Sequence, residues 1–365
     1  MKVLQVTPTY APARGGIEAV VENLSRALTG LGVRSDIVHL APGLARTRRE
    51  DDGLTVFTAP LAGGRLLGFA PGLGRLAADY DLIHMHDPQV AAISLTLFLS
   101  PGTPPRVLST HGGFHHTPRL RWLKMFHQRV SAPLLLGGYR RVLATSAADL
   151  ALFSGTRTQS VLMENGVDVA RFKPSAQLGP RPLNRWICWG RLSSNKRLER
   201  LIALVGQARA AGQIIDLLIC GTDFDGLAEG LQAQIDAAGL GGQVKLGTAL
   251  GEDELRREIE TRGAFVTASA YEGFGLTVVE AMAAGLVVVC RDIAPLNTFV
   301  TAGQTGFFLR FDDGDQDLET LTRMLALPQD EARAMLGHGR RVTARYDWAV
   351  KVREYLALYE AVLEP

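Results

Sequence analysis

The stretch Glu272-Gly-Phe-Gly-Leu-Thr-Val-Val-Glu280 decides the interpretation of this sequence. It follows an apolar run, Ala264–Thr267, that is typical of a buried strand, and it continues into a helical segment. The glycines at 273 and 275 let the backbone approach a ligand closely, and the amides at the following helix start favour an anion. The second glutamate lies about one turn into that helix, where it can accept hydrogen bonds from vicinal hydroxyls. A solvated helix surface is the alternative for a glutamate pair alone, but the surrounding glycines favour a binding loop.

The composition indicates a soluble protein of two domains. The chain has 365 residues, of which 47% are hydrophobic and 21% charged, and each half is long enough to bury a core. A net charge of +2 argues against a nucleic-acid binder that relies on bulk charge. The apolar run near Val90–Leu99 is too short to span a bilayer, and a strand-like run follows Met1 at once, so we expect no signal peptide. We therefore expect a cytoplasmic location.

Short apolar runs alternate with helical segments along the whole chain. We expect strands at 2–6, 35–40, 54–58, 82–86, 107–110, 141–145, 186–189, 215–220, 244–246, 264–267 and 287–290. This alternation is the pattern of βαβ units, so the predicted fold class is α/β, with two Rossmann-like, doubly wound parallel sheets. Ligands of such sheets bind in loops that follow the carboxyl ends of the strands.

A change of composition near residue 171 divides the chain. The stretch 171–185 is polar, non-periodic and interrupted by three prolines, which is typical of a linker. We therefore expect an N-terminal domain over 1–170 and a C-terminal domain over 186–345. The last segment, 346–365, is predicted to be a helix.

Two further strand-to-helix loops carry binding chemistry. Gly190-Arg191-Leu-Ser-Ser-Asn-Lys196 places a forked cation and a point charge five residues apart, which suits a diphosphate, although a solvated basic turn is the alternative for this piece alone. The first strand leads into Pro12-Ala-Arg-Gly15-Gly16. This loop lacks the GxGxxG of dinucleotide folds, which argues against a nicotinamide or flavin enzyme.

Histidines end two of the predicted strands in the first half. His111 follows the strand 107–110, while His84 and His86 end the strand 82–86 and precede Asp87. A histidine in such a place is usually a structural residue of the core. The alternative is that these side chains, together with Asp87, line a ligand cleft.

The stretch 272–280 resembles the signature of a large family. Two glutamates separated by seven residues, with EGFGL followed by EAMAAG, match without gaps the retaining glycosyltransferase family 4, the group 1 transferases with the GT-B fold. The loops at 15–16 and 190–196, His111 and the Asn165-Gly-Val-Asp168 turn extend the resemblance over nearly the whole chain. It implies two domains that face each other across a cleft, an acceptor domain over 1–170 and a nucleotide-sugar domain over 186–345, with the C-terminal helix crossing back to the first.

The resemblance also implies roles for single residues. Arg191 and Lys196 would neutralise the donor diphosphate in place of a metal, Glu272 would bind sugar hydroxyls and Glu280 the ribose. The catalytic positions assigned in this way are Arg191, Lys196, Glu272 and His111, the last as a contact to the donor sugar. The donor-binding positions are Gly15, Gly16, Gly190, Gly273, Phe274, Gly275, Leu276 and Glu280. Glu18, beside the glycine pair, is interpreted as structural.

Residues 114–141 are basic and amphipathic. From Phe114 to Ala148 there are six basic residues and no acidic one, with apolar side chains at helical spacing between them. Such a segment suits an anionic membrane surface, and a core-packed helix with a solvated basic face is an equal alternative. Members of the family that elongate lipid-diphosphate-linked sugars often have such a surface, which favours a lipid-linked acceptor and peripheral membrane contact.

Neither the cysteines nor an acidic loop indicates a metal. Cys188, Cys220 and Cys290 lie in separate apolar runs, which predicts buried free thiols in a reducing compartment. Asp312-Asp-Gly-Asp315 lacks the remaining ligands of a calcium loop, so we interpret it as a polar loop. We expect neither a metal nor a cofactor.

The combined prediction is a retaining, metal-independent hexosyltransferase. It would move a mannose- or glucose-type unit from GDP-mannose or a UDP-sugar to a hydroxyl of a glycan or lipid-linked acceptor, in cell-envelope or exopolysaccharide synthesis. A nucleotide-sugar epimerase of the same architecture is one alternative, and it would release nucleotide and sugar without an acceptor. A non-catalytic nucleotide-sugar-binding subunit is the other.

Overall fold

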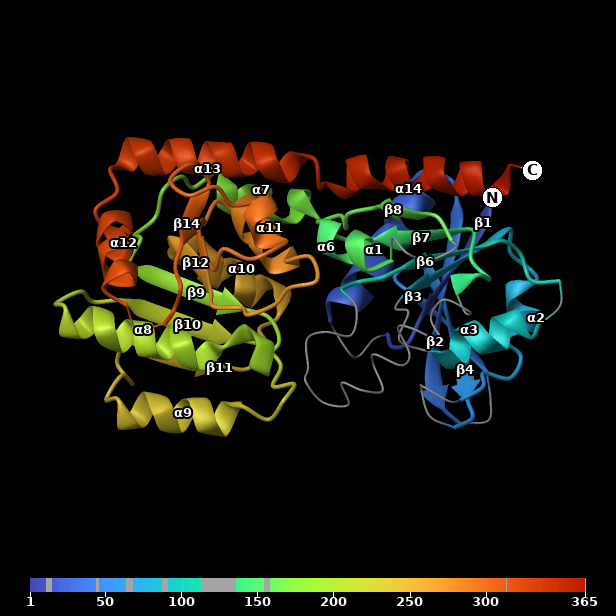
Figure 1. The fold of residues 1–365 in the computed structure, drawn as a ribbon, viewed down its shortest axis with the longest axis horizontal. Coiled ribbons are helices and arrows are strands. Elements are labelled where there is room, and N and C mark those ends of the chain that lie inside the picture. Colours follow the sequence, from blue (N-terminus) through green and yellow to red (C-terminus); the bar gives the residue numbers. More distant parts are fainter. Residues whose placement is uncertain are drawn as a thin grey trace. The chain divides into compact units, whose positions relative to one another are not determined.

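The chain forms two compact units (Figure 1). The computed structural model describes residues 1–10, 15–43, 46–63, 68–86, 91–100, 102–112, 136–153, 158–312 and 314–364. Unit 1 comprises Met1–Gly166 and Trp348–Pro365, and unit 2 comprises Val167–Asp347. Each unit has its own sheet and its own hydrophobic core.

Unit 1 is built on an eight-stranded sheet with the order β3-β4-β2-β1-β5-β6-β7-β8. The strands are β1 (Lys2–Thr7), β2 (Arg34–Pro42), β3 (Thr47–Asp51), β4 (Leu54–Leu61), β5 (Leu82–His86), β6 (Arg106–Ser109), β7 (Arg141–Ala144) and β8 (Ser160–Leu162). All neighbours pair in parallel except the edge strand β3, which is antiparallel to β4. The chain turns in opposite directions from β1, toward β2 on one side and β5 on the other.

The two faces of this sheet differ in polarity. The described helices of unit 1 are α1 (Gly16–Gly30), α2 (Leu73–Ala77), α3 (Ala91–Phe98), α6 (Ala147–Phe153) and α14 (Trp348–Leu363). On one face, Leu4, Val6 and Met85 belong to an apolar core that includes residues of α2 and α3. On the other, the alternate strand residues Gln5 and His84 are polar and fully buried, and bond side chains of β2 and α14. Helix α14 packs against α1.

Unit 2 is built on a six-stranded parallel sheet with the order β11-β10-β9-β12-β13-β14. Its strands are β9 (Arg185–Trp189), β10 (Asp216–Cys220), β11 (Val244–Gly247), β12 (Ala264–Thr267), β13 (Val287–Cys290) and β14 (Gly306–Phe308). Its helices are α7 (Val169–Ala176), η2 (Ser194–Lys196), α8 (Leu198–Ala210), α9 (Ala228–Ala237), α10 (Glu252–Thr261), α11 (Leu276–Ala283), η3 (Leu296–Thr298), α12 (Asp315–Leu325) and α13 (Gln329–Ala344). The order runs outward in both directions from β9 and β12, as in a dinucleotide-binding sheet.

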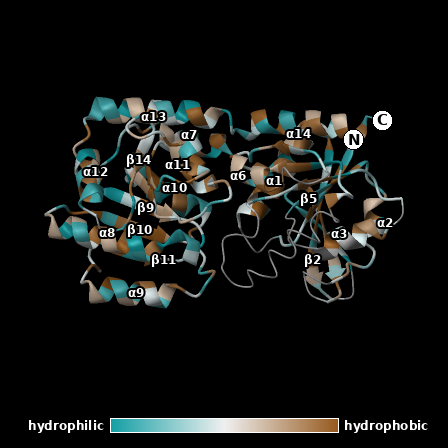
Figure 2. Cartoon of the chain, in the orientation of Figure 1, coloured by the Kyte–Doolittle hydropathy of each residue, from teal (hydrophilic) through white to brown (hydrophobic). Residues whose placement is uncertain are grey.

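Alternation along β9 sends its side chains into two separate cores. Trp186 and Cys188 pack with apolar residues of α8 and α9, while Ile187 and Trp189 pack on the opposite face with α11. Helices α8 and α9 carry hydrophobic and hydrophilic residues side by side (Figure 2), as expected for helices that bury one face. The two doubly wound sheets expected from the sequence are thus confirmed.

The predicted strands are all present, and the structure adds β3, β8 and β14 to them. These three strands lack the apolar run from which the other strands were predicted. Strand β3 is mostly exposed and carries polar and charged side chains, and β8 and β14 are three residues each. A short or solvent-facing strand shows no run of buried side chains, because its position depends on pairing with a neighbour.

The stretch 171–185, expected to be a linker, lies inside unit 2 and begins within α7. Its carbonyls are held by arginines. Arg340 donates to Ala176 O at 2.8 Å, and Arg181 donates to Ser175 O at 3.2 Å and to Ala284 O at 3.0 Å. These long-range contacts anchor a segment whose composition shows no periodicity. The C-terminal helix α14 is part of unit 1.

Candidate functional site

The candidate site of unit 2 lies where its strand order reverses. Strands β9 and β12 are neighbours in the sheet, and the connections that leave their carboxyl ends lead to opposite sides. In parallel sheets this arrangement separates two loops and leaves a crevice for ligands. The loops here are 190–196 after β9 and 268–275 after β12, which are the two stretches singled out by the sequence.

The loop after β9 is paired with the loop after β10. Leu192 N donates to Thr222 O at 2.8 Å, and Phe224 N donates to Leu192 O at 3.0 Å. A Cβ atom at Gly221 would lie 1.5 Å from Gly190 O, so only glycine permits this approach. Arg191 is exposed at this ribbon, and its guanidinium carbon lies 4.9 Å from the ring centroid of Phe224. An exposed guanidinium supported in this way is available to an anion.

Asn195 joins the loop after β9 to the loop after β12. Ala270 N donates to Asn195 O at 2.8 Å, and Asn195 Nδ2 donates to Tyr271 O at 3.1 Å. Ser193 Oγ fixes the amide by donating to Asn195 Oδ1 at 2.7 Å. The sequence analysis missed Asn195 because an asparagine in a loop is an ordinary turn residue. Its effect is to hold the two predicted motifs against each other.

Lys196 and Glu272 meet as a result. Lys196 Nζ lies 2.6 Å from Glu272 Oε1, and the two side chains are only 14% and 12% exposed. A partly buried pair at this distance is a strong charge-assisted hydrogen bond. Removing either partner would leave the other charge poorly solvated.

The helix start after Glu272 has a conformation that requires glycine. Gly275 caps α11 with φ 94°, and a Cβ atom there would lie 2.5 Å from Leu296 Cδ2. Phe274 is buried and packs edge-on against Phe299 and Tyr346, with centroid distances of 5.2 and 5.6 Å. The aromatic contacts therefore fix the loop. Helix α11 begins at Leu276, and its first hydrogen bond is donated by Val278 N to Gly275 O at 2.9 Å, so the amides of Leu276 and Thr277 precede the hydrogen-bonded turn.

Glu280 lies one turn further along α11, beneath Trp189 of β9. Trp189 Nε1 donates to Glu280 Oε2 at 3.1 Å. Burial raises the pKa of the Glu280 carboxyl above its ordinary value of 4.5, while the Trp189 hydrogen bond and nearby positive charges act against this rise. The contact leaves Oε1 of the carboxylate for another donor. Trp189 was not identified from the sequence as a site residue, since a strand tryptophan reads as core.

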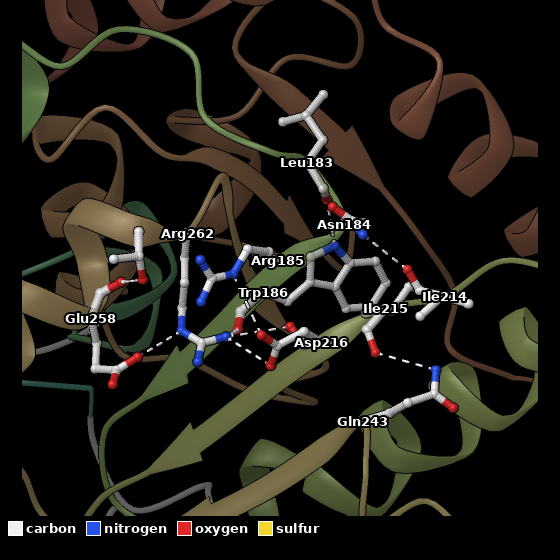
Figure 3. Close-up of polar contacts among 11 residues, drawn as sticks. Leu183, Asn184, Arg185, Trp186, Ile214, Ile215, Asp216, Gln243, Glu258 and Arg262 are labelled. Carbon is white, nitrogen blue, oxygen red and sulfur yellow. Dashed lines mark hydrogen bonds and ion pairs between the residues drawn. The ribbon is translucent and has the colours of Figure 1, made fainter.

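The opposite end of the same sheet carries a second group of charges (Figure 3). The guanidinium of Arg262 lies between Glu258 and Asp216, with N–O distances of 3.0 and 3.3 Å, and it donates to Trp186 O at 2.8 Å. Arg185 Nε lies 3.4 Å from Asp216 Oδ2. Arg262 is 3% exposed. Because these contacts use its donors within the protein and lie at the amino ends of the strands, we interpret this group as structural.

In unit 1 the glycine pair lies at the corresponding point of the first sheet, after β1. Gly15 is the N-cap of α1, and Gly16 is its first residue. A Cβ atom at Gly15 would lie 2.5 Å from Glu18 Oε2, and the other oxygen of Glu18 accepts a short hydrogen bond from Thr9 Oγ1. Glu18 thus holds the loop in place. Arg14 and the rest of 11–14 lie outside the described residues.

His111 follows β6 in unit 1, with its backbone in the left-handed region at φ 48°. Its Nε2 lies 2.9 Å from Nδ1 of His86, which ends β5. Asp149 holds the turn. Its Oδ2 accepts hydrogen bonds from Thr110 Oγ1 at 2.6 Å and from Gly112 N at 2.9 Å. Asp149 was missed because Ser-Ala-Ala-Asp at 146–149 reads as a helix cap.

Other sequence expectations are resolved only in part. The three cysteines are buried and free, as predicted. Asp317 accepts hydrogen bonds from Arg310 N and Phe311 N, and Asp315 begins α12. Asp87, Asp313 and residues 113–135 of the basic segment lie outside the described residues.

In the described part of the chain, no cluster of three His, Cys, Asp or Glu side chains is placed to hold a metal, and none of the helices combines the length and hydropathy needed to cross a membrane.

Comparison with known proteins gives matches over both units. A family model described as Glycosyl transferases group 1 matches residues 175–341, and one described as Glycosyltransferase Family 4 matches residues 14–171. A GDP-mannose:cellobiosyl-diphosphopolyprenol alpha-mannosyltransferase of Komagataeibacter xylinus is 31% identical, covering 100% of this chain and 94% of the relative. A phosphatidyl-myo-inositol mannosyltransferase of Mycolicibacterium smegmatis is 27% identical, covering 99% of this chain and 94% of the relative.

The solved structures agree on the fold. Anabaena HepE, in complex with UDP and glucose, superposes with a TM-score of 0.78 at 21% identity and covers 99% of this chain and 100% of its own. Sucrose-phosphate synthase of Thermosynechococcus elongatus superposes with a TM-score of 0.78 at 20% identity, covering 99% of each chain. The likeness extends over both units.

Proposed function

The chain belongs to the group 1 glycosyltransferases of the GT-B fold, and we propose that it transfers a mannosyl unit from GDP-mannose to a hydroxyl of a lipid-diphosphate-linked glycan. That it is a hexosyltransferase acting on a nucleotide sugar follows from its family. The choice of GDP-mannose and of a lipid-linked acceptor rests on the relative that is 31% identical, which is named as a GDP-mannose:cellobiosyl-diphosphopolyprenol alpha-mannosyltransferase.

One observation carries the site assignment. Asn195 joins the two loops at the strand-order reversal of unit 2. This brings Lys196 against Glu272, a few residues before α11 begins at Leu276, and Arg191 belongs to the same loop as Lys196. Such a group offers an anion the guanidinium of Arg191, the ammonium of Lys196 and the backbone amides at the start of α11. A nucleoside diphosphate is the part of a sugar donor that needs these contacts, because it leaves with an added negative charge.

The proposed mechanism assigns each residue of the group a step. Arg191 and Lys196 bind the diphosphate and stabilise the charge that develops as the bond to the anomeric carbon breaks. Gly190 and the backbone at Gly273–Leu276 line the phosphates, and Glu280 accepts hydrogen bonds from the ribose hydroxyls. Glu272, held by Lys196, accepts a hydrogen bond from a sugar hydroxyl. In unit 1, Gly15 and Gly16 line the donor phosphates, and His111 contacts the sugar.

We also propose that the configuration at the anomeric carbon is retained without a metal. The acceptor hydroxyl attacks from the face that the diphosphate leaves, and a phosphate oxygen takes the hydroxyl proton. The products are then the glycoside and the nucleoside diphosphate, so atoms and charge balance without a separate base. This assignment gives the carboxylates of Glu272 and Glu280 binding roles only.

The location of the acceptor is proposed from residues 114–141. This basic, amphipathic segment would bring unit 1 to an anionic membrane surface on the cytoplasmic side, where a lipid-linked acceptor is presented. Removing charge from it should weaken binding to vesicles that contain anionic lipid and leave GDP binding unchanged.

A product assay tests the proposed function. The full chain is incubated with GDP-mannose and a polyprenyl-diphosphate-linked disaccharide, and the product is resolved by mass spectrometry and its anomer by NMR. We expect acceptor-dependent GDP release and an α-linked mannosyl product. Equal GDP release without acceptor would instead support hydrolysis or epimerase-type chemistry, and a β-linked product would contradict retention. A parallel reaction with UDP-glucose tests the choice of donor.

A further inference from the structure

A chain of hydrogen bonds runs from helix α1 to His111 through the polar face of the unit 1 sheet. Ser35 Oγ donates to Ser25 Oγ at 3.2 Å, and Gln5 Nε2 donates to Ser35 Oγ at 3.2 Å. The other end of the Gln5 amide, Oε1, lies 2.8 Å from His86 Nε2. His86 Nδ1 lies 2.9 Å from His111 Nε2. All members before His111 are buried to at least 97%.

The direction of each bond follows from the one before it. Gln5 Oε1 is a carbonyl oxygen and can only accept, so His86 must carry its proton on Nε2. A neutral His86 then has an unprotonated Nδ1, which accepts a hydrogen bond from His111. His111 must therefore carry its own proton on Nε2, and its Nδ1 is left as an acceptor.

His86 and His111 are both neutral at physiological pH. Burial lowers the pKa of His86 well below its ordinary value and lowers the pKa of His111 to about 4. A single proton on each ring makes the tautomer decisive, since a neutral imidazole has one donor and one acceptor.

Neighbouring contacts hold the two rings in position. The His84 ring contacts that of His86 with a centroid distance of 4.0 Å and an interplanar angle of 37°, and His84 is itself held by Tyr359 of α14 at 2.6 Å and Ser109 at 2.8 Å. At the other ring, the turn pinned by Asp149 fixes the left-handed backbone of His111. His111 is partly exposed, and within the described residues no hydrogen bond reaches its Nδ1. Among the described residues, that nitrogen is left as an acceptor for a ligand.

We propose that Gln5 and His86 are positioning residues that hold neutral His111 in its Nε2–H tautomer, so that Nδ1 accepts a hydrogen bond from a hydroxyl of the donor sugar. The sugar contact rests on the proposed function, whereas the tautomer rests on the hydrogen-bond chain alone. A hydroxyl can donate to this nitrogen, whereas a group that only accepts, such as a carbonyl or carboxylate oxygen, cannot bond to it. The hydrogen bonds from Gln5 through His86 thereby determine that His111 Nδ1 bonds a donor group.

The tautomer is measured directly on the full-length free protein. Nitrogen-15 NMR of histidine-labelled protein reports which ring nitrogen carries the proton, and the His111 signal is assigned by its loss in His111→Gln. We expect a protonated Nε2 and an unprotonated Nδ1 near pH 7. A protonated Nδ1 would overturn the proposal, whether or not the enzyme proves to be a glycosyltransferase.

Gln5→Glu tests the positioning role. A carboxylate beside His86 Nε2 favours the imidazolium, whose Nδ1–H then donates to His111 and moves the His111 proton to Nδ1. We expect the reversed tautomer, unchanged affinity for GDP, and a kcat/KM for GDP-mannose that is lower by about 10–100-fold, because two donors then face each other. An unchanged tautomer with unchanged kcat/KM would overturn the proposal. If the wild-type protein itself does not bind GDP, the proposed function is contradicted instead.

Two further variants complete the test. His39→Gln removes a unit 1 histidine that bonds Thr58 and is not part of the hydrogen-bond series from Ser25 to His111. This variant should leave the His111 signals and kcat/KM unchanged. If Gln5→Glu does not fold, Gln5→Met removes the acceptor without adding charge. Both tautomers of His111 should then appear, and a single Nε2–H signal in that variant would overturn the role of Gln5.

Discussion

The two ends of strand β9 carry charged groups that differ in how their donors are used. At the amino end, Arg262 is 3% exposed and its guanidinium bonds two carboxylates and a strand carbonyl (Figure 3). At the carboxyl end, Lys196 bonds Glu272, while the neighbouring Arg191 is exposed and lies over the ring of Phe224. The comparison teaches that proximity of opposite charges does not mark a site. A buried arginine with its donors satisfied stabilises the sheet, and an exposed arginine on a loop at the carboxyl ends of the strands can bind a ligand.

Substitution of Arg191 should have the largest effect on activity. Arg191→Ala removes the fork that stabilises the departing diphosphate, so kcat/KM should fall by about 100–1000-fold with little change in thermal stability. Steady-state kinetics and a thermal melt check this. Arg256→Ala, which removes an exposed arginine of α10, should keep wild-type kinetics. Equal kinetics for the two variants would contradict the assignment of Arg191.

Arg262→Ala should show the opposite behaviour. It leaves Trp186 O and Glu258 without this partner, while Asp216 keeps Arg185, and we expect a loss of about 2–4 kcal/mol in the free energy of unfolding. Because the carboxylates are 39% and 40% exposed, solvent compensates in part. The melting temperature of unit 2 should fall by about 5–10 °C, with kcat/KM per folded molecule unchanged below the transition. A specific loss of donor affinity would show that this end of the sheet also takes part in binding.

Gly275→Ala should lower both the stability of the protein and its affinity for the donor nucleotide. A side chain at φ 94° costs about 1–3 kcal/mol, and the added Cβ would displace Leu296 and the start of α11. We expect lower stability and weaker GDP binding together, measured by thermal melts and calorimetry. Gly230→Ala in α9 meets no atom within 4 Å and should be neutral or slightly stabilising. Wild-type GDP affinity in Gly275→Ala would contradict the role of this helix start.

Glu280→Gln should have the smallest effect. The KM for the donor should rise by about 3–10-fold at neutral pH, because an amide oxygen accepts more weakly than a carboxylate. The pKa of Glu280 is raised above 4.5, so in the wild type the KM should rise as pH falls through that raised value, and the Gln variant should lack this dependence. Glu199→Gln on α8 is the control.

The same pKa shift predicts the effect on stability. A carboxyl whose folded-state pKa is raised contributes stability that is fully present below its unfolded pKa and is lost as pH rises through the folded value. Glu280→Gln should therefore melt no lower than the wild type at pH 7. A clear loss of stability there would mean that the carboxylate is retained for folding.

Much of the fold and part of the site could be predicted from sequence. Strand–helix alternation identifies both sheets, since buried parallel strands are continuous apolar runs. The pairs Arg191–Lys196 and Glu272–Glu280 could be found because they lie within contiguous motifs. Asn195, Asp149 and Gln5 could not, because their roles depend on partners 37 to 81 residues away, and those contacts form only on folding. The inclusion of 171–185 in unit 2 likewise depends on partners distant in sequence, because Arg340 donates to Ala176 O and Arg181 donates to Ala284 O.

The central claim is that a nucleoside diphosphate binds at the carboxyl end of the unit 2 sheet. Hydrogen–deuterium exchange with and without GDP tests it directly, because both ends of β9 are observed in one experiment. We expect GDP to slow exchange in the loops 190–196 and 270–277 and to leave 258–262 unchanged. Unchanged exchange in both loops at saturating GDP, or protection confined to 258–262, would contradict the account.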